Sequence, residues 1–499
     1  MLPTTVSCRV RTFLGRVNPD AVACPTERAY AGNPALTSDF FANGGPSLAA
    51  GDARRHAPCM KKHPTRLGFG VHLSVLFLAA SVVSAQSSTP MVFVSNNGNL
   101  EGSVTAFRIE PDGSLDLVNR VITGTRTSTS LPCAGCNAYS VAVSPDGRFI
   151  AASHAAGDAP LPDGISIFEV AVDGSIALSL LYPLYNLGSP LDILWVSETH
   201  IAVTRTNLSG GSQVATYRFN PATPSLTFVD VEAAGSFSTA LDFDAGGRFL
   251  YAQDSTGYRV FGYAVATSGQ LTPTGNASSA SVYPLGIGLA PDGSRLYGGG
   301  GISSGSHAIC GFSLEAGVPS LMPQSPFYSP GTSPKQVVVE GSGAFAFAAH
   351  GTDATIRTFS VDPRNGGLVA TGGSYDVGVQ GSLGEIATLG ELLFATDRDT
   401  IGDGRRGVGS FAILDNGSLL PIGGFVDTEG ITPNGVAAWA PGAPPCPADL
   451  NGDGTVNASD LAGLLASWNG RGSADLDGDG TVGPADLAQL LASWGPCGG

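Results

Sequence analysis

Residues 140–153 read Ser-Val-Ala-Val-Ser-Pro-Asp-Gly-Arg-Phe-Ile-Ala-Ala-Ser, and this stretch decides the fold of most of the chain. Two short apolar segments flank the turn Pro145-Asp146-Gly147, whose glycine tolerates the positive φ that a tight hairpin needs. β-Branched and aromatic residues between such turns are typical of strands. The stretch therefore predicts a β-hairpin.

The hairpin is one part of a repeat of about fifty residues that runs through most of the chain. It returns at 241–253 and at 285–299, and a second type of hairpin with an Asp-Gly turn occupies residues 103–115. The first strand of each copy centres near Val141, Ile193, Leu241, Ile287, Val337, Ile386 and Val436. Four strands at this period are typical of a β-propeller blade.

The two ends of the repeat array predict a closed ring. The first copy begins with its second strand, Met91–Ser95, and the missing first strand is found at the far end as Asn434–Trp439. A C-terminal strand that completes the N-terminal blade leaves no exposed array end. We therefore expect a mainly β fold with a seven-bladed propeller over residues 91–441, in preference to an open solenoid or two β-sandwiches.

Composition excludes one class of function. The chain has 499 residues, too many for a single core, and a formal net charge of −16. Lysine occurs at Lys61, Lys62 and Lys335 alone. Nucleic-acid binding rests on phosphate neutralisation by Lys and Arg, so nucleic acid is not an expected partner.

The N-terminal region predicts export. Residues 1–59 show no periodicity and are expected to be a non-native or disordered extension. Met60 opens a basic start, followed by an apolar run over 67–83 and small residues at Val83–Ala85. This pattern is typical of a signal peptide, here 60–85, and the alternative is a single membrane anchor. We expect a secreted protein without a membrane span after cleavage, in which Cys133 and Cys136 form a local disulfide.

A second type of sequence follows a short linker at 442–445. Residues 449–460 and 475–486 share an Asp-rich pattern with a 26-residue offset, and an apolar helix is expected after each. Calcium takes six to eight oxygen ligands, which a twelve-residue EF-hand-like loop supplies from positions 1, 3, 5, 7, 9 and 12. The expected ligands of two calcium ions are Asp449, Asn451, Asp453, the Thr455 carbonyl, Asn457, Asp460, Asp475, Asp477, Asp479, the Thr481 carbonyl and Asp486. The helices carry Leu461, Leu464, Leu465 and Leu487, Leu490, Leu491, which predict one apolar face on each.

Polar residues follow the second strand of most propeller repeats. These positions are Asn96, His154, Arg205 or Thr206, Asp254, Gly301, His350 and Asp397. One interpretation is a ring of acid, base and hydrogen-bond groups around a pocket, with His154, Arg205, Asp254, His350 and Asp397 as catalytic candidates. The other is strand-end capping, in which these side chains satisfy loop backbone groups.

The propeller part resembles a known family. Phe93-Val-Ser-Asn96, with the Pro-Asp-Gly and Asp-Gly-Ser-Leu turns, is similar to the YVTN and lactonase-like seven-bladed propellers, which include 6-phosphogluconolactonase. The resemblance implies a lactonase-type hydrolase with His, Arg and Glu in the loops. This chain departs from it, because Asp254 stands where a Glu is expected and blade five offers the glycines 298–301.

The C-terminal segment, 446–499, resembles the type I dockerin, since its duplicated loop-then-helix units lack an entering helix. That resemblance implies calcium, a cohesin partner and a link to extracellular polysaccharide catabolism. Cys446 and Cys497 bracket the segment, and a disulfide between them would join its ends. Dockerins commonly carry hydroxylated residues at loop positions 10 and 11, whereas this chain has Ala458-Ser459 and Pro484-Ala485.

Together these patterns indicate a secreted calcium-binding protein. We expect the propeller to be a non-catalytic binding platform for a glycan or small molecule, attached to an assembly or cell surface through the dockerin-like unit. The alternative is a secreted lactonase-like or carbohydrate-active hydrolase brought to polysaccharide by the same unit.

Overall fold

The computed structural model describes residues 87, 89–126, 133–155, 162–185, 187–207, 211–244, 246–279, 282–300, 306–351, 353–377, 382–398, 407–441, 448, 450, 455–470, 474, 476 and 481–496. The expected N-terminal extension (1–59), signal peptide (60–85) and linker (442–445) lie outside them. No helix within these ranges is both long and apolar enough to cross a membrane.

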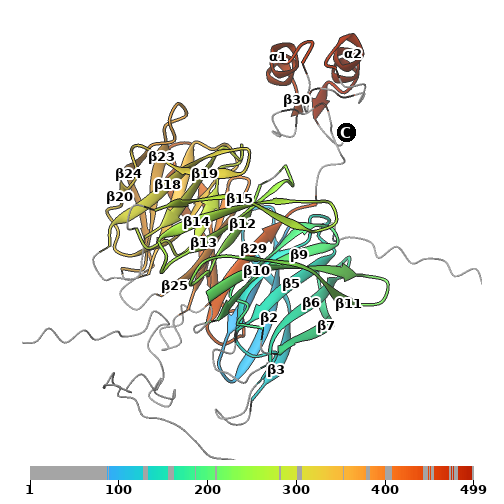
Figure 1. Cartoon of the computed structure of the whole chain (residues 1–499), viewed down its shortest axis with the longest axis vertical. Coiled ribbons are helices and arrows are strands. Elements are labelled where there is room, and N and C mark those ends of the chain that lie inside the picture. The colour runs from blue at the N-terminus through green and yellow to red at the C-terminus, as the bar shows by residue number, and fades with distance from the viewer. Residues whose placement is uncertain are drawn as a thin grey trace, which may run out of the picture. The chain divides into compact units, whose positions relative to one another are not determined.

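Seven antiparallel sheets form the blades of a propeller, as the repeat predicts (Figure 1). Six of them have four strands, and the sheet of blade 5 has a fifth. Blade 1 contains β29 (Pro433–Trp439), β1 (Met91–Asn97), β2 (Glu101–Ile109) and β3 (Leu115–Thr125). Blade 2 contains β4 (Ala138–Val143), β5 (Phe149–His154), β6 (Pro162–Val170) and β7 (Ile176–Tyr185). Blade 3 contains β8 (Ile193–Ser197), β9 (His200–Asn207), β10 (Gly211–Asn220) and β11 (Ser225–Ala233).

The remaining blades follow in chain order. Blade 4 contains β12 (Leu241–Phe243), β13 (Phe249–Asp254), β14 (Arg259–Val265) and β15 (Leu271–Ser278). Blade 5 contains β16 (Ile287–Leu289), β17 (Arg295–Gly299), β18 (Ala308–Glu315) and β19 (Val318–Leu321), with β20 (Phe327–Tyr328) also paired to β18. Blade 6 contains β21 (Pro334–Val339), β22 (Phe345–His350), β23 (Thr355–Val361) and β24 (Leu368–Asp376). Blade 7 contains β25 (Leu383–Leu389), β26 (Leu392–Asp397), β27 (Gly407–Ile413) and β28 (Leu419–Val426).

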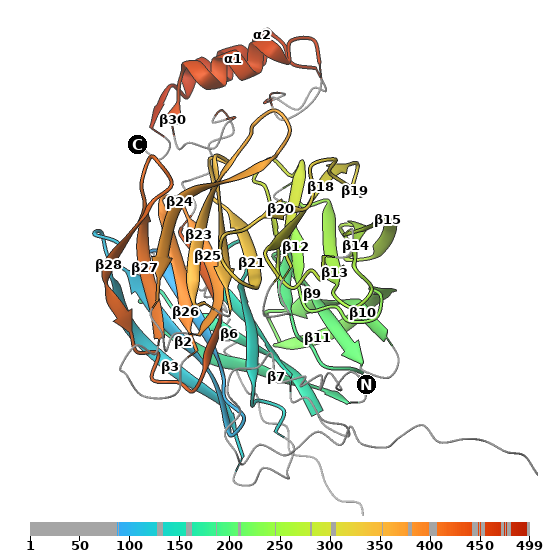
Figure 2. The ribbon, with the colours of Figure 1, turned by 90° about the vertical axis from the view of Figure 1, so that its left-hand side faces the viewer.

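The ring closes as expected, through the strand contributed by the far end of the propeller sequence. β29 pairs antiparallel with β1, and Val94 lies opposite Val436. Figure 2 shows the blue strands β2 and β3 of blade 1 beside the orange strands β26 to β28 of blade 7. The prediction of a closed seven-bladed propeller is therefore confirmed.

The hydrophobic core of the propeller lies between the blades. Seven clusters of buried residues each join two neighbouring blades. In β1, Met91 and Phe93 pack toward blade 2, whereas Val92 and Val94 pack toward blade 7. Successive side chains of a strand point to opposite faces, and here both faces are buried. This double burial explains why β1 is a continuous apolar run rather than an alternating pattern.

The turn that opened the sequence argument also has a packing role. Gly147 has φ +67°, and a Cβ at this position would lie 2.2 Å from Cε2 of Trp439. The indole Nε1 of Trp439 donates to the carbonyl of Pro145 at 3.3 Å. The closing strand is thus fixed to blade 2 as well as to β1.

The C-terminal module is built from two equivalent halves. It contains β30 (Thr455–Val456), α1 (Ala458–Ala466), α2 (Pro484–Ala492) and β31 (Gly495–Pro496). Val456 pairs with Gly495, and Val482 exchanges backbone hydrogen bonds with Asn469 and Gly470. Each loop therefore pairs with the segment that follows the helix of the other half.

The packing of the helices differs in part from the expected apolar faces. Leu464 and Leu490 are fully buried in the core of the module, with Leu461 and Leu487 packed against them. Leu465 and Leu491 stay 52% and 51% exposed. Residues at i+1 on a helix point about 100° away from their neighbour, so one position of each Leu pair reaches solvent.

Removal of β29 is predicted to unfold the propeller. A chain that ends at residue 441 should melt cooperatively. A chain that ends at residue 432 lacks β29, so the edge of β1 is exposed and the cooperative transition should be lost. Val436 and Trp439 are 7% and 8% exposed, and burial of each stabilises the fold by about 1.5–3 kcal/mol. Thermal unfolding followed by circular dichroism compares the two, and equal melting curves would contradict closure by β29.

Candidate functional site

The predicted ring of polar residues lies at the ends of the second strands, but its described side chains are buried. Asn96, His154 and His350 have no exposed surface, Asp397 and Asp254 are 1% and 2% exposed, and Thr206 and Arg205 are 5% and 8% exposed. Gly301 lies outside the described residues. None of the described members is among the residues that line the central cavity. Whether any of them is catalytic stays a prediction.

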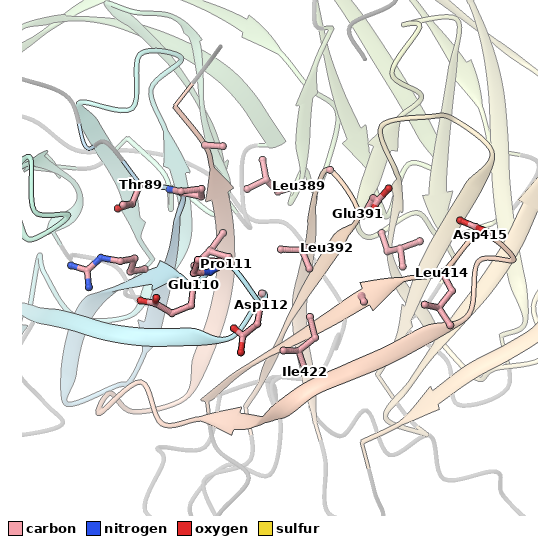
Figure 3. Close-up of a pocket in the computed structure, with 18 of the residues that line it drawn as sticks. Thr89, Glu110, Pro111, Asp112, Leu389, Glu391, Leu392, Leu414, Asp415 and Ile422 are labelled. Carbon is pink, nitrogen blue, oxygen red and sulfur yellow. The ribbon is translucent and has the colours of Figure 1, made fainter. Parts of the chain in front are cut away.

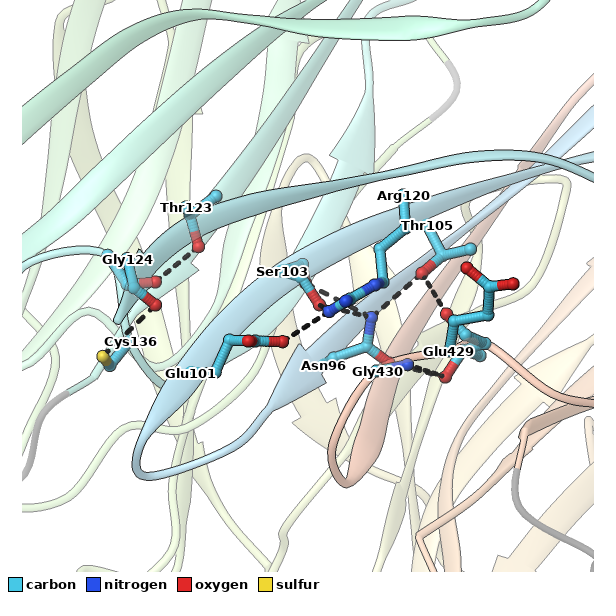
Figure 4. A network of polar contacts seen from close by, with 12 residues as sticks. Asn96, Glu101, Ser103, Thr105, Arg120, Thr123, Gly124, Cys136, Glu429 and Gly430 are labelled. Carbon is cyan, nitrogen blue, oxygen red and sulfur yellow. Dashed lines mark hydrogen bonds and ion pairs between the residues drawn. The ribbon is translucent and has the colours of Figure 1, made fainter. Parts of the chain in front are cut away.

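Asn96 shows what these side chains do in the fold (Figure 4). Its Nδ2 donates to Oγ of Ser103 and to Oγ1 of Thr105, each at 3.0 Å. Its Oδ1 accepts from Oγ1 of Thr428 at 2.8 Å. Thr428 follows the last strand of blade 7, so Asn96 links the first and last blades of the ring.

The two histidines make similar contacts. Nε2 of His154 lies 2.7 Å from Oγ of Ser166, and Nε2 of His350 lies 2.7 Å from Oγ of Ser329. Burial lowers the pKa of both imidazoles to about 4, because the charged form is poorly solvated there. Both are therefore neutral near pH 7.

The remaining ring residues bind loop backbone. Oδ1 of Asp254 accepts from the N–H groups of Phe237 and Gly257 at 2.9 and 3.0 Å, and Oδ1 of Asp397 accepts from Ser382 N–H at 3.1 Å. Nε of Arg205 donates to the Leu187 carbonyl at 2.8 Å. These contacts are those of strand-end capping.

A cavity of about 620 Å³ occupies the centre of the ring. It is lined by the inner strand of each blade, and this volume is typical of a small-molecule site. Its polar lining includes Tyr139, Asp192, Thr239, Asp242, Lys335, Gln336, Glu385 and Arg398.

Three of these polar groups stabilise the ring itself. Asp192 Oδ2 accepts from Leu241 N–H at 2.7 Å, and Asp242 Oδ2 accepts from Leu289 N–H at 2.6 Å. Oε1 of Gln336 accepts from Ile386 N–H at 2.7 Å. In each case a side chain on an inner strand, or directly before it, satisfies a backbone donor at the free edge of the next blade.

Lys335, Glu385 and Arg398 form a group of mutually interacting charges. Burial, together with the nearby Arg398, lowers the pKa of Lys335 to about 7, although Glu385 opposes the shift. Burial, and next the Asp192 carboxylate, raise the pKa of Glu385 to about 8. Burial also lowers the pKa of Arg398 and raises that of Asp242 to about 6. Strongly shifted groups that share a cavity are typical of functional sites.

The sequence interpretation missed this group although a signal was present. Lys335 is the one lysine beyond residue 62, and it lies next to Pro334 at the start of an inner strand. Register explains the miss, since Pro334 lies opposite His350 and Leu383 opposite Asp397. The predicted ring residues thus end the second strands of the blades, opposite the residues that begin the inner strands. The inner strands, and not the second strands, line the cavity.

The described cysteines form one disulfide and one free thiol. Cys133 and Cys136 form a disulfide with a Cα–Cα distance of 5.3 Å. Cys310 is a buried thiol, and burial raises its pKa to about 12. Cys446 and Cys497 lie outside the described residues.

The C-terminal loops are organised around the carboxylate at position 12. Asp460 and Asp486 are 0% and 1% exposed. Asp460 accepts from the N–H groups of Leu450 and Asn457, both at 2.8 Å, and Asp486 accepts from those of Leu476 and Gly483, both at 2.6 Å. Each carboxylate therefore joins the start of its loop to the start of its helix.

This arrangement fits calcium. A fixed, buried carboxylate at position 12 is the type of hard oxygen donor that calcium prefers. The expected ligands Asp449, Asn451, Asp453, Asp475, Asp477 and Asp479 lie outside the described residues. Within the described ranges, no group of three or more His, Cys, Asp or Glu side chains could hold a metal ion.

A second cleft, of about 1200 Å³, lies where the turns of blade 7 meet blade 1 (Figure 3). Leu389, Leu392 and Ile422 contribute apolar side chains to its lining, and Glu110 and Asp112 contribute carboxylates. Asp112 accepts from the N–H and hydroxyl groups of Ser114, so its carboxylate is used within its own turn.

Comparisons with known proteins agree with both halves of this description. Residues 447–492 match the Dockerin type I domain family. The propeller is similar to a putative 6-phosphogluconolactonase from Bacteroides uniformis, with 16% identity and a TM-score of 0.55 over 71% of this chain and 100% of that one. It is also similar to the periplasmic gluconolactonase of Pseudomonas aeruginosa, with 17% identity and a TM-score of 0.52 over 71% and 100% of the two chains. No curated protein matches the chain significantly. Both resemblances expected from the sequence are confirmed, and at these identities the propeller likeness shows the fold alone.

Replacement of Lys335 by methionine is predicted to stabilise the protein below neutral pH. The folded-state pKa of about 7 lies below the ordinary lysine value of 10.5, so the folded protein binds fewer protons than the unfolded chain between these values. Burial of the charged amine lowers the free energy of unfolding. This cost is fully present below pH 7 and disappears as the pH rises toward 10.5. Lys335→Met should raise the melting temperature at pH 6 by roughly 2–4 °C, and the gain should vanish near pH 10.

Arg364→Met is the matched control, because Arg364 is an exposed cation in a turn. This variant should change the melting temperature only slightly, and by the same amount at pH 6 and at pH 10. A pH-independent effect of Lys335→Met would contradict a desolvated lysine.

Proposed function

We propose that the chain is a secreted protein attached to a cohesin-bearing extracellular assembly through its C-terminal module, and that its propeller binds a small ligand in the central channel. The observation that carries attachment is the match of residues 447–492 to the Dockerin type I domain. One calcium ion binds in each loop, with Asp460 among the ligands in the first loop and Asp486 in the second.

The surface of the module supports attachment. Leu465 and Leu491 occupy equivalent positions on α1 and α2 and are each about half exposed, as is Trp494. Exposed apolar side chains at matching positions of a small module are suited to contact with a partner. Ala458-Ser459 and Pro484-Ala485 lie at the start of the same helices and are small, so they leave the helix ends accessible.

Binding in the channel is supported by its chemistry. The cavity combines apolar strand residues with a few convergent charged groups, which is the usual composition of a ligand site. Glycans and small organic acids offer hydroxyl and carboxylate groups that could bond with Arg398 and Lys335.

Lactone hydrolysis is a second candidate, which the position of Glu385 in the channel favours. Near pH 7 its raised pKa keeps much of this carboxyl protonated, so it can give a proton to the oxygen that leaves when the ring opens. Arg398 could stabilise the negative charge that develops on the carbonyl oxygen when water attacks it.

Attachment is predicted to depend on calcium. Immobilised full-length chain should retain recombinant cohesin modules in calcium and release them in chelator, because the acidic loops repel one another without metal. The double variant Asp460→Asn/Asp486→Asn should lose metal uptake, measured by calorimetry, and with it binding. Leu465→Ser should keep the metal but weaken binding by roughly tenfold or more, because it removes an exposed apolar contact.

The matched control is Asp292→Asn, the same chemical change in an exposed propeller turn. It should alter neither metal uptake nor binding. Retention that is equal with and without chelator would refute the proposed attachment.

Hydrolysis is predicted to require Glu385 if the chain is a lactonase. Purified full-length protein should hydrolyse members of a panel of sugar and aromatic lactones, and the acid that is released measures the rate. Glu385→Gln should lower this rate by roughly 100-fold or more. Loss of activity in His154→Ala with an unaffected Glu385→Gln would instead place the chemistry at the predicted ring. Absence of hydrolysis across the panel would leave binding as the function of the channel.

A further inference from the structure

Lys335 is an unusual residue for this chain. It is the sole lysine between residues 63 and 499, where all the other strongly basic side chains are arginines. It lies on β21 and lines the central cavity, where charged side chains are costly to place. A lysine that occurs once, in an unfavourable position, suggests a role for the amine itself.

The backbone and the side chain of Lys335 bond to two different neighbouring blades. The backbone carbonyl of Lys335 accepts from Gly286 N–H of blade 5 at 2.8 Å, and Nζ donates to the Leu383 carbonyl of blade 7 at 3.1 Å. Within the described residues, this carbonyl is the one hydrogen-bond partner of Nζ. An ammonium has three N–H donors and no lone pair, so a site with one acceptor favours the neutral amine, whose lone pair stays available.

A guanidinium with an unpaired donor atom lies in the same cavity. Arg398 is 8% exposed, and its Nε is buried without a hydrogen-bond partner among the described residues. A guanidinium presents a planar set of donors that binds carboxylates in a bidentate manner. A buried donor without a partner is costly, and an anionic ligand would satisfy it.

Glu385 completes the arrangement. Burial, followed by the Arg398 charge, lowers the pKa of Lys335 to about 7, and burial raises the pKa of Glu385 to about 8. Near neutral pH the cavity therefore contains an amine that is substantially uncharged and a carboxyl that is largely protonated. A desolvated lysine next to another cation is an activated nucleophile.

We propose that Lys335 condenses reversibly with a small ligand that carries both a carbonyl group and a carboxylate, which Arg398 binds. The proposal rests on ligand binding in the channel, and it adds the chemical class of the ligand. Aldehyde acids and α-keto acids have both groups, and they fit a cavity of about 620 Å³.

The chemistry balances without a further reagent. The Nζ lone pair attacks the carbonyl carbon, and the C=O π electrons move to oxygen, which takes a proton from Glu385. Glu385 then recovers a proton from nitrogen. In the second step Glu385 protonates the hydroxyl group, which leaves as water, and again recovers a proton from nitrogen. Both N–H protons of the amine end in the released water, a C=N bond replaces C=O, and nothing is oxidised or reduced.

Reductive trapping tests the proposal. Full-length protein is incubated at pH 7 with glyoxylate or pyruvate and cyanoborohydride, which converts an imine to a stable amine, and labelled peptides are mapped by mass spectrometry. Lys335 should be labelled roughly 100-fold or more faster than Nα-acetyl-lysine added to the same solution, because an ordinary lysine is almost wholly protonated at this pH. Lys335→Met should lose the adduct.

The role of Arg398 has its own readout. Arg398→Gln should slow labelling by glyoxylate roughly 10- to 100-fold more than labelling by acetaldehyde, the value of a charge-assisted hydrogen bond. Acetaldehyde should lose only the part that follows from a higher pKa of Lys335 once the Arg398 charge is gone. An equal loss with both aldehydes would overturn carboxylate binding by Arg398. Mapping of the wild-type protein does not depend on whether a variant folds.

Lactate separates failure of this proposal from failure of channel binding, since it has the carboxylate but no carbonyl. Lactate binding detected by saturation-transfer NMR, without an adduct at Lys335, would overturn the imine alone. Labelling of Lys335 at the same rate as the added Nα-acetyl-lysine would also overturn it. Absence of both the adduct and lactate binding would overturn ligand binding in the channel as well.

Discussion

The free edge of each inner strand determines the chemistry of the channel. An inner strand pairs with one neighbour, so its other edge presents backbone N–H groups that need acceptors. Asp192, Asp242 and Gln336 supply these acceptors from the adjacent blade. A closed ring of seven sheets thus requires polar side chains at its centre, and it brings carboxylates together in a space of low polarity. Burial in this space is the main cause of the raised pKa of Glu385 and of the lowered pKa of Lys335.

Most of the fold could be predicted from local sequence patterns. Asp-Gly turns fix the hairpins, and the missing first strand before Met91 identifies closure by the strand that ends at Trp439. The continuous apolar run of β1 reports burial on both faces between two blades. These features depend on residues close in sequence, or on counting repeats, and both can be read without coordinates.

The candidate site was less predictable because it is made by contacts between blades. Polarity after an apolar strand pointed to His154 and Asp397, and these side chains are buried and bonded to their surroundings. The cavity residues lie on different strands, and the carboxylates among them follow no common motif. In contrast, the calcium ligands could be named one by one as an expectation, because they lie within twelve consecutive positions, and the structure describes the position-12 carboxylates Asp460 and Asp486 as buried.

Cross-pairing of the two halves of the C-terminal module has a consequence for its origin. Val456 pairs with Gly495 and Val482 with Asn469, so each half supplies the strand partner of the other. One 26-residue unit alone would leave that strand and its buried leucine unmatched. Such a unit could fold only by associating with a second copy, and gene duplication with fusion would convert that twofold dimer into the single-chain module seen here.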